Sequence, residues 1–128
     1  MYMKLISIVP SNRKDKKYKA TFELYKDPVK GNGARPTQPY TMILSTHFGA
    51  KRRDGTNYRD YTLMSNPKSE FYIKNSGERE KVRQAYLKRH AKEDWMKPMT
   101  AGSLSRWILW EKTTLPAAIK NFKRKFSV

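Results

Sequence analysis

A strict alternation of polar and apolar residues over Lys17–Tyr25 is the feature that most constrains the fold of this chain. One face of the segment carries Tyr18, Ala20, Phe22 and Leu24. A period of two residues is typical of a β-strand that buries one face. The apolar, β-branched segment 3–9 precedes it across a polar turn, so we expect the two to form an antiparallel hairpin. Residues 40–48 alternate in the same way and predict a third strand.

Helical spacing replaces this alternation in the second half of the chain. Ser76 is a suitable N-cap for a helix with acidic residues in its first turn and basic residues in its last. We expect Thr100 to cap a second, short helix, and Thr113 or Thr114 to cap a third, whose apolar residues recur at intervals of three and four. Strands followed by helices predict an α+β fold, in which a small antiparallel sheet of about three N-terminal strands is covered by C-terminal helices.

The chain has the length of one domain. Its 128 residues, 38% of them hydrophobic, predict a single basic domain spanning residues 1–128. Within this domain, the sequence does not decide whether residues 57–76 form helix, strand or loop. There are no cysteines, which excludes disulfides and thiolate ligands, and two histidines do not make a structural zinc site. No segment approaches the ~18–20 apolar residues of a membrane helix, and no phosphate-cradling motif is present. We therefore expect no metal, no cofactor and no transmembrane segment.

The net charge indicates an anionic partner. Lys and Arg total 28 against 11 Asp and Glu, a formal charge of +17, and the excess is spread along the chain rather than gathered in a tail. Most of these cations therefore have no acidic partner within the chain. A molecule of this charge repels itself and attracts polyanions or acidic protein surfaces, so we expect it to be part of a larger assembly.

Three basic clusters are the candidate contact surfaces. The first is the hairpin tip, with Arg13, Lys14, Lys16, Lys17 and Lys19; the second is Lys51, Arg52, Arg53 and Arg59, interleaved with Tyr58 and Tyr61; the third is Lys120, Lys123, Arg124 and Lys125. Cations beside aromatic rings suit a surface that contacts phosphates and stacks on bases. The alternative is an ordinary solvated surface, because runs of charged residues usually are solvated. No cluster matches a motif that recognises a specific DNA or RNA sequence.

Two tryptophans and two histidines are further candidates. Trp107 and Trp110 lie three apart on one predicted helix, so either one of them faces a partner or both close the core. His47 has no partner in the sequence that would make it a general base, and His90 suits the negative end of a helix dipole. We therefore expect no catalytic residue and no enzymatic activity.

Three segments carry a resemblance to a known family. They are residues 47–51 (HFGAK), residues 86–90 (YLKRH) followed by Trp95, and residues 100–110 (TAGSLSRWILW) followed by Leu115 and a basic end. Together they resemble a family of short basic proteins of unknown function that are encoded by nucleocytoplasmic large double-stranded DNA viruses of algae and protists. The resemblance covers most of residues 1–10 and 40–126. Relative to the compact family pattern, residues 27–39 and 64–77 are expected to be loop insertions.

The resemblance implies a viral context rather than a particular chemistry, because the family has no established catalytic residues. It implies a non-enzymatic minor structural protein, which is associated with the capsid of a large DNA virus and docks on acidic surfaces of viral capsid proteins through its basic loops. The expected location is the virion, or otherwise the host cytoplasm. The alternative is a protein that binds DNA or RNA without sequence specificity and neutralises the phosphate backbone.

Overall fold

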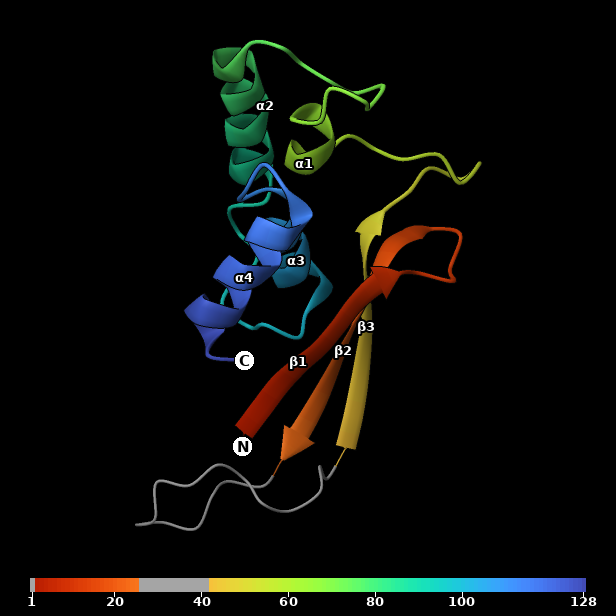
Figure 1. Cartoon of the computed structure of the whole chain (residues 1–128), viewed down its shortest axis with the longest axis vertical. Coiled ribbons are helices and arrows are strands. Elements are labelled where there is room, and N and C mark those ends of the chain that lie inside the picture. The colour runs from red at the N-terminus through yellow and green to blue at the C-terminus, as the bar shows by residue number, and fades with distance from the viewer. Residues whose placement is uncertain (1, 26–41) are drawn as a thin grey trace.

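The sheet comes first in the chain. The computed structural model describes residues 2–25 and 42–128. The strands β1 (Tyr2–Pro10), β2 (Lys16–Tyr25) and β3 (Met42–Ala50) form an antiparallel sheet in the order β1-β2-β3 (Figure 1). The predicted hairpin and third strand are thus confirmed, although the expected loop 27–39 and the first residues of the third predicted strand lie outside the described residues.

Within the described residues, all helices follow the sheet. They are α1 (Tyr61–Met64), α2 (Ser76–Arg89), α3 (Ala101–Leu104), the π-helix η1 (Ser105–Leu109) and α4 (Leu115–Phe126). α3 and η1 pack against β3, and α4 packs on η1, whereas α1 and α2 stand beyond one end of the sheet (Figure 1). This is the predicted α+β fold, with C-terminal helices beside a small N-terminal sheet.

Each α-helix begins at a side chain that caps its first turn. Asp60 caps α1, Asn75 caps α2, Thr100 caps α3 and Thr114 caps α4. The threonine caps agree with the prediction, but Ser76 is the first helical residue of α2 and not its cap. The reason is that the side-chain oxygen of Asn75 accepts a hydrogen bond from the Glu78 N–H at 3.0 Å.

The segment between β3 and α2 is mostly turns apart from α1. The sequence leaves a short strand or a surface insertion open for Phe71, Tyr72 and Ile73, and the structure forms no strand there. Phe71 lies in a turn, and both Phe71 and Ile73 pack against the core. The N–H of Ile73 donates to the carbonyl of Met64 at 2.9 Å. The segment is therefore a packed loop that covers one end of the core.

One hydrophobic core joins the sheet to the helices. The sheet contributes Leu5, Ala20, Phe22 and Phe48, and the helices contribute Met64, Leu104, Ile108 and Phe122. The alternation of β2 is confirmed here, since Ala20, Phe22 and Leu24 are buried. Burial of one large apolar side chain contributes ~1.5–3 kcal/mol, so this cluster is a main source of stability.

Candidate anion-binding site

A cavity of about 550 Å³ opens where the end of the sheet meets the helices. Its lining comes from the ends of β2 and β3, from residues 52–60, from the C-terminal end of α2 and from η1. This volume lies within the ~300–1,000 Å³ range of pockets that hold small organic ligands. The fold thus brings together groups that lie far apart in the sequence.

A buried ion pair belongs to the lining of the cavity. Lys17 Nζ lies 2.6 Å from Asp60 Oδ2, and the two side chains are only 7% and 2% exposed. The same ammonium group donates to the backbone carbonyl of Tyr58 at 2.6 Å. Burial of a charge is costly unless the charge is paired and hydrogen-bonded, as both are here. The sequence places Lys17 among the hairpin-tip cations, but its burial removes it from those that an external partner can reach.

Asp60 also fixes the segment that carries Tyr58 and Arg59. Its second oxygen, Oδ1, accepts hydrogen bonds from the Leu63 N–H at 2.9 Å and from the Thr62 hydroxyl at 2.5 Å. Asp60 is therefore tied to β2 through one oxygen and to α1 through the other. Its two preceding neighbours are held at the cavity as a result.

Stacked aromatic rings form one wall. The Tyr86 ring lies 4.2 Å from the Trp110 ring at an interplanar angle of 7°, and 4.4 Å from the His90 ring. All three residues line the cavity. Burial raises the pKa of Tyr86 to about 12, and the Glu93 carboxylate acts in the same direction. The phenol therefore keeps its proton just above pH 10, where an exposed tyrosine loses it.

The backbone approaches the cavity wall closely at Gly49. Its φ is +78°, and a Cβ there would lie 3.0 Å from Lys17 Cβ and 3.0 Å from Leu109 Cδ1. Glycine fits this position because it has no Cβ and tolerates positive φ.

The π-helix η1 also contributes to the cavity, since Ser105 at its start and Leu109 at its end belong to the lining. π-Helical turns occur frequently at functional sites.

The cavity is positively charged. Three exposed arginines line it, namely Arg52, Arg59 and Arg89. Asp60 is the one carboxylate among the described residues of the lining, and its charge is paired with Lys17. The Arg52 guanidinium lies 4.9 Å from the centre of the Tyr58 ring, and it donates to the Asn57 carbonyl at 2.8 Å. An arginine beside an exposed tyrosine offers an anion both charge and a stacking surface.

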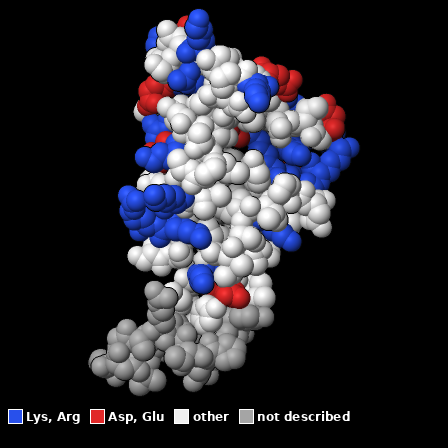
Figure 2. Space-filling view, in the orientation of Figure 1, with Lys and Arg blue, Asp and Glu red and all other residues white. Residues whose placement is uncertain are grey.

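The structure joins the first two basic clusters into one surface. The Lys51 N–H donates to the Asp15 carbonyl at 2.9 Å, and the Lys14 side chain lies beside Gly55. We call this surface the basic end, and its exposed cations are Arg13, Lys14, Arg52, Arg53 and Arg59, with Lys16 and Lys51 half-buried. It adjoins the cavity, since Arg52 and Arg59 belong to both, and Figure 2 shows basic atoms gathered there. Lys19 lies further along β2, half-buried and opposite His47 of β3.

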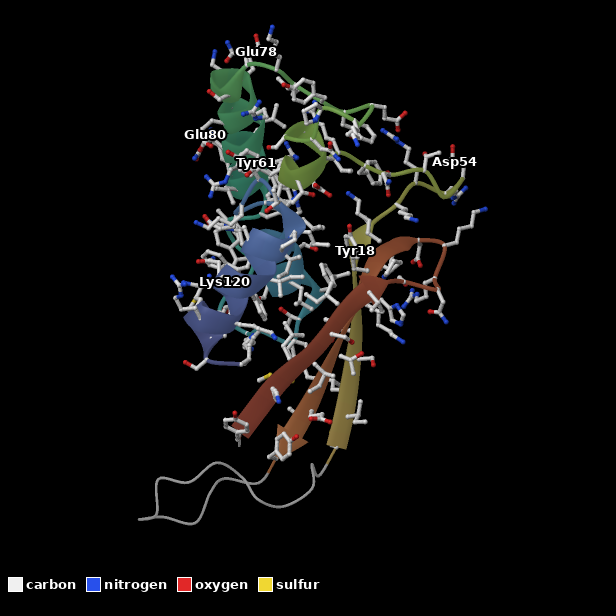
Figure 3. The ribbon with its side chains drawn as sticks, in the orientation of Figure 1. Tyr18, Asp54, Tyr61, Glu78, Glu80 and Lys120 are labelled. Carbon is white, nitrogen blue, oxygen red and sulfur yellow. The ribbon has the colours of Figure 1, made fainter. Side chains whose placement is uncertain are left out.

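The third basic cluster is separate. Lys120, Lys123, Arg124 and Lys125 are exposed on α4. In Figure 3, Lys120 lies on the opposite side of the molecule from Asp54, which belongs to the turn of the basic end. A second group of basic atoms marks α4 in Figure 2. Within the part of the chain that the structure describes, the three predicted clusters thus lie on two separate surfaces.

The two tryptophans have different surroundings. Trp110 is buried in the core and stacks on Tyr86, as described above. Trp107 is half-buried, its indole N–H donates to the Trp95 carbonyl at 2.9 Å, and the Lys125 ammonium lies 4.3 Å from the centre of its ring. Both therefore help to close the core, and Trp110 also faces the cavity.

Several residues of the cavity lie outside the clusters that the sequence indicates. Of the two predicted tyrosines, Tyr58 lines the cavity, whereas Tyr61 is half-buried in α1 with the Arg83 guanidinium 5.7 Å from the centre of its ring. The lining residues that the sequence analysis missed include Asp60, Phe71, Tyr86 and Arg89. No local pattern marks them, because they share only the place where the fold brings them together.

His47 is linked to the β1–β2 turn. Its Nδ1 lies 2.7 Å from Ser11 Oγ, and that oxygen also accepts from the Arg13 N–H at 3.0 Å. The Ser11 oxygen thus joins the His47 imidazole to the backbone N–H of Arg13. This pair ties the hairpin tip to β3.

Comparison of the chain with protein-family models, with curated proteins and with solved structures found no match. The resemblance to viral proteins therefore stays a prediction. In residues 2–25 and 42–128, no group of three or more His, Cys, Asp or Glu side chains is placed to hold a metal ion. None of the helices in this part of the chain is long and apolar enough to cross a membrane.

Proposed function

We propose that this protein binds nucleic acid without sequence specificity, through phosphate contacts made by the basic end. The observation that supports the proposal most is the arrangement of Arg52, Arg59 and the exposed ring of Tyr58 around an aromatic cavity. Arginine binds phosphate through two parallel hydrogen bonds and keeps its charge at any physiological pH. Such contacts depend on the backbone and not on the bases, so they carry no sequence information.

The charges of the basic end are accessible to an external anion. Arg13 is paired with Asp15 at 3.1 Å, but both side chains are more than half exposed, at 53% and 59%. An exposed pair of this kind is weak and exchanges readily for another oxyanion. Arg53 and Arg59 are exposed as well. Each phosphate that these groups neutralise would release condensed counterions from the nucleic acid.

The shape of the site favours nucleic acid over an acidic protein at the basic end. Carboxylates on a protein surface would offer oxyanions to the same arginines. A nucleotide supplies a phosphate and an aromatic ring together, which matches arginines placed beside Tyr58 and an aromatic cavity. An acidic protein surface supplies the charge alone.

The salt dependence of DNA binding tests this proposal. In fluorescence anisotropy with labelled duplex DNA, we expect the logarithm of the affinity to fall linearly with the logarithm of the salt concentration. The slope on duplex DNA is about −0.9 for each phosphate neutralised. An affinity that does not change with salt, or an absence of binding at low salt, would contradict the proposal.

A second proposal keeps the viral context and is favoured by the positions of the two basic surfaces. The basic end and α4 lie on opposite sides of the molecule, so one copy can contact two acidic partners at once (Figure 2). A non-enzymatic, capsid-associated structural protein would use them to join capsid proteins. Lysine cross-linking with mass spectrometry on the native particle tests this. Cross-links to capsid proteins from both surfaces would support it, whereas recovery with the nuclease-released genome would favour genome binding.

A further inference from the structure

We infer that the cavity receives one unstacked base of a single nucleic-acid strand, while Arg52 and Arg59 hold the phosphates beside it. The inference rests on the proposed function and adds a preference for single strands over duplexes. It assigns a ligand class, an aromatic base joined to phosphates, to a cavity that phosphate binding alone leaves unused. The argument depends on three properties of the cavity: its available ring, its rigidity and its polar groups.

Tyr58 is the ring available for stacking. Tyr86 and Trp110 stack on each other at 4.2 Å, and His90 lies 4.4 Å from Tyr86, so these rings already use their faces on one another. Tyr58 is 49% exposed, and Arg52 lies over one face of its ring. The exposed part of this ring can therefore accept a base at the mouth of the cavity, as aromatic residues do in proteins that bind single strands.

The segment that carries Tyr58 is held in place before any ligand arrives. The Lys17 ammonium binds the Tyr58 carbonyl at 2.6 Å and the Asp60 carboxylate at 2.6 Å. A β-bridge between Lys51 and Asn57 closes the turn that precedes it. Because little order is lost from this segment on binding, more of the stacking energy remains as affinity.

Two residues that line the cavity carry hydroxyl groups, which have no fixed preference for one base. Tyr86 and Ser105 belong to its lining. A hydroxyl both donates and accepts, and it rotates to suit its partner, so it can meet donors and acceptors on any base edge. This agrees with binding that does not depend on sequence.

A duplex cannot use the cavity without disruption. Its bases are stacked and paired, so a base enters a protein cavity only after it is extruded from the helix, at a cost in free energy. An unpaired strand already has bases that can turn outward. The cavity therefore adds affinity for single strands, whereas phosphate contacts by the basic end serve both forms.

An abasic oligonucleotide separates the inference from the function on which it rests. We would measure, by fluorescence anisotropy, the affinity of the protein for a labelled thymidine oligonucleotide and for an abasic oligonucleotide of equal length and charge. We expect the thymidine strand to bind about tenfold more tightly, since stacking on one aromatic ring has this order of effect. Tyr58→Ala should remove the difference in affinity between the two strands.

Tyr72→Ala is the matched control. Tyr72 is 39% exposed on the neighbouring loop and does not line the cavity, so we expect this variant to keep the preference for the thymidine strand. Equal affinity of the wild type for the two strands would overturn the inference and leave phosphate binding standing. A preference that survives Tyr58→Ala would overturn it also, because the base would then lie elsewhere. Failure of both strands to bind would contradict the proposed function and the inference with it.

Discussion

The basic end and α4 carry similar charge, but they present it in different settings. On α4, the four cations are exposed side chains of one amphipathic helix, whose other face packs in the core. At the basic end, Arg52 and Arg59 line a cavity together with the buried pair of Lys17 and Asp60. A row of solvated cations attracts any polyanion, whereas arginines that line a cavity also select by shape. Charge alone therefore does not distinguish a site from a solvated surface.

Removing the buried carboxylate of Asp60 should cause the largest loss in the free energy of unfolding, whereas the same change in an exposed pair should not. Asp60→Asn leaves the Lys17 charge buried without a counter-charge, while asparagine can still cap α1. Loss of one partner of a buried pair costs ~3–5 kcal/mol, and we expect urea unfolding to show a loss of this order. Asp15→Asn in the exposed pair with Arg13 is the control and should change stability little. Similar losses in both variants would show that burial does not set the strength of the Lys17–Asp60 pair.

A methyl group at Gly49 should produce the next largest effect. Gly49→Ala combines a positive φ with a Cβ that would lie 3.0 Å from Leu109 and Lys17. The left-handed conformation alone costs a residue with a Cβ roughly 1–2 kcal/mol, and we expect at least this loss in the free energy of unfolding. Gly102→Ala in α3 is the matched control, because its Cβ would meet the flexible carboxylate end of Glu93. Since alanine favours helix, that variant should be as stable as the wild type or more so.

Equal losses of charge at the two basic surfaces test whether position matters for binding. Arg52→Gln with Arg59→Gln, and Lys123→Gln with Arg124→Gln, each remove two exposed cations. We expect the first double variant to weaken binding of a labelled single strand by about tenfold or more, the effect of one lost charged hydrogen bond. The second should weaken it less. The same loss in both would mean that total charge governs binding and that the cavity has no special part.

The strands and helix caps could be predicted because their evidence is local. The alternation over β2 is a property of consecutive residues, and the buried Ala20 and Phe22 bear it out. Thr100 and Thr114 cap α3 and α4 as expected, since a cap acts on an N–H three residues away. Asn75 was missed because two adjacent residues, Asn75 and Ser76, both suit a cap, and composition does not choose between them.

The cavity could not be predicted because its parts are distant in sequence. Lys17 falls on the polar side of the alternation and belongs to a basic run, which indicates a solvated lysine. Its partner Asp60 lies 43 residues later, and only the tertiary fold brings the N-cap of α1 to the start of β2, where the two side chains are buried together. Arg89 likewise suits the end of a helix by its dipole, and nothing local places it in the lining of the same cavity as Arg59. Tertiary structure thus decides which cations form a site.

Alkaline pH should lower the stability of the folded protein through the cavity wall and not through α4, and this is the smallest of the expected effects. Burial raises the pKa of Tyr86, in the cavity wall, from 10.0 to about 12, whereas α4 contains no tyrosine. Below about pH 10 the phenol is protonated in both the folded and the unfolded chain, and it adds no pH dependence. Between the two pKa values the unfolded chain releases the proton while the folded protein keeps it, so stability falls as pH rises. At about pH 11 the loss from Tyr86 is about 1 kcal/mol.

Urea unfolding at neutral pH and at about pH 11 should therefore show a smaller alkaline loss of stability for Tyr86→Phe than for the wild type. Tyr72→Phe, which removes a hydroxyl from an exposed ring, is the control for the substitution itself. An unchanged alkaline loss of stability in Tyr86→Phe would show that the cavity wall does not shield this phenol from water.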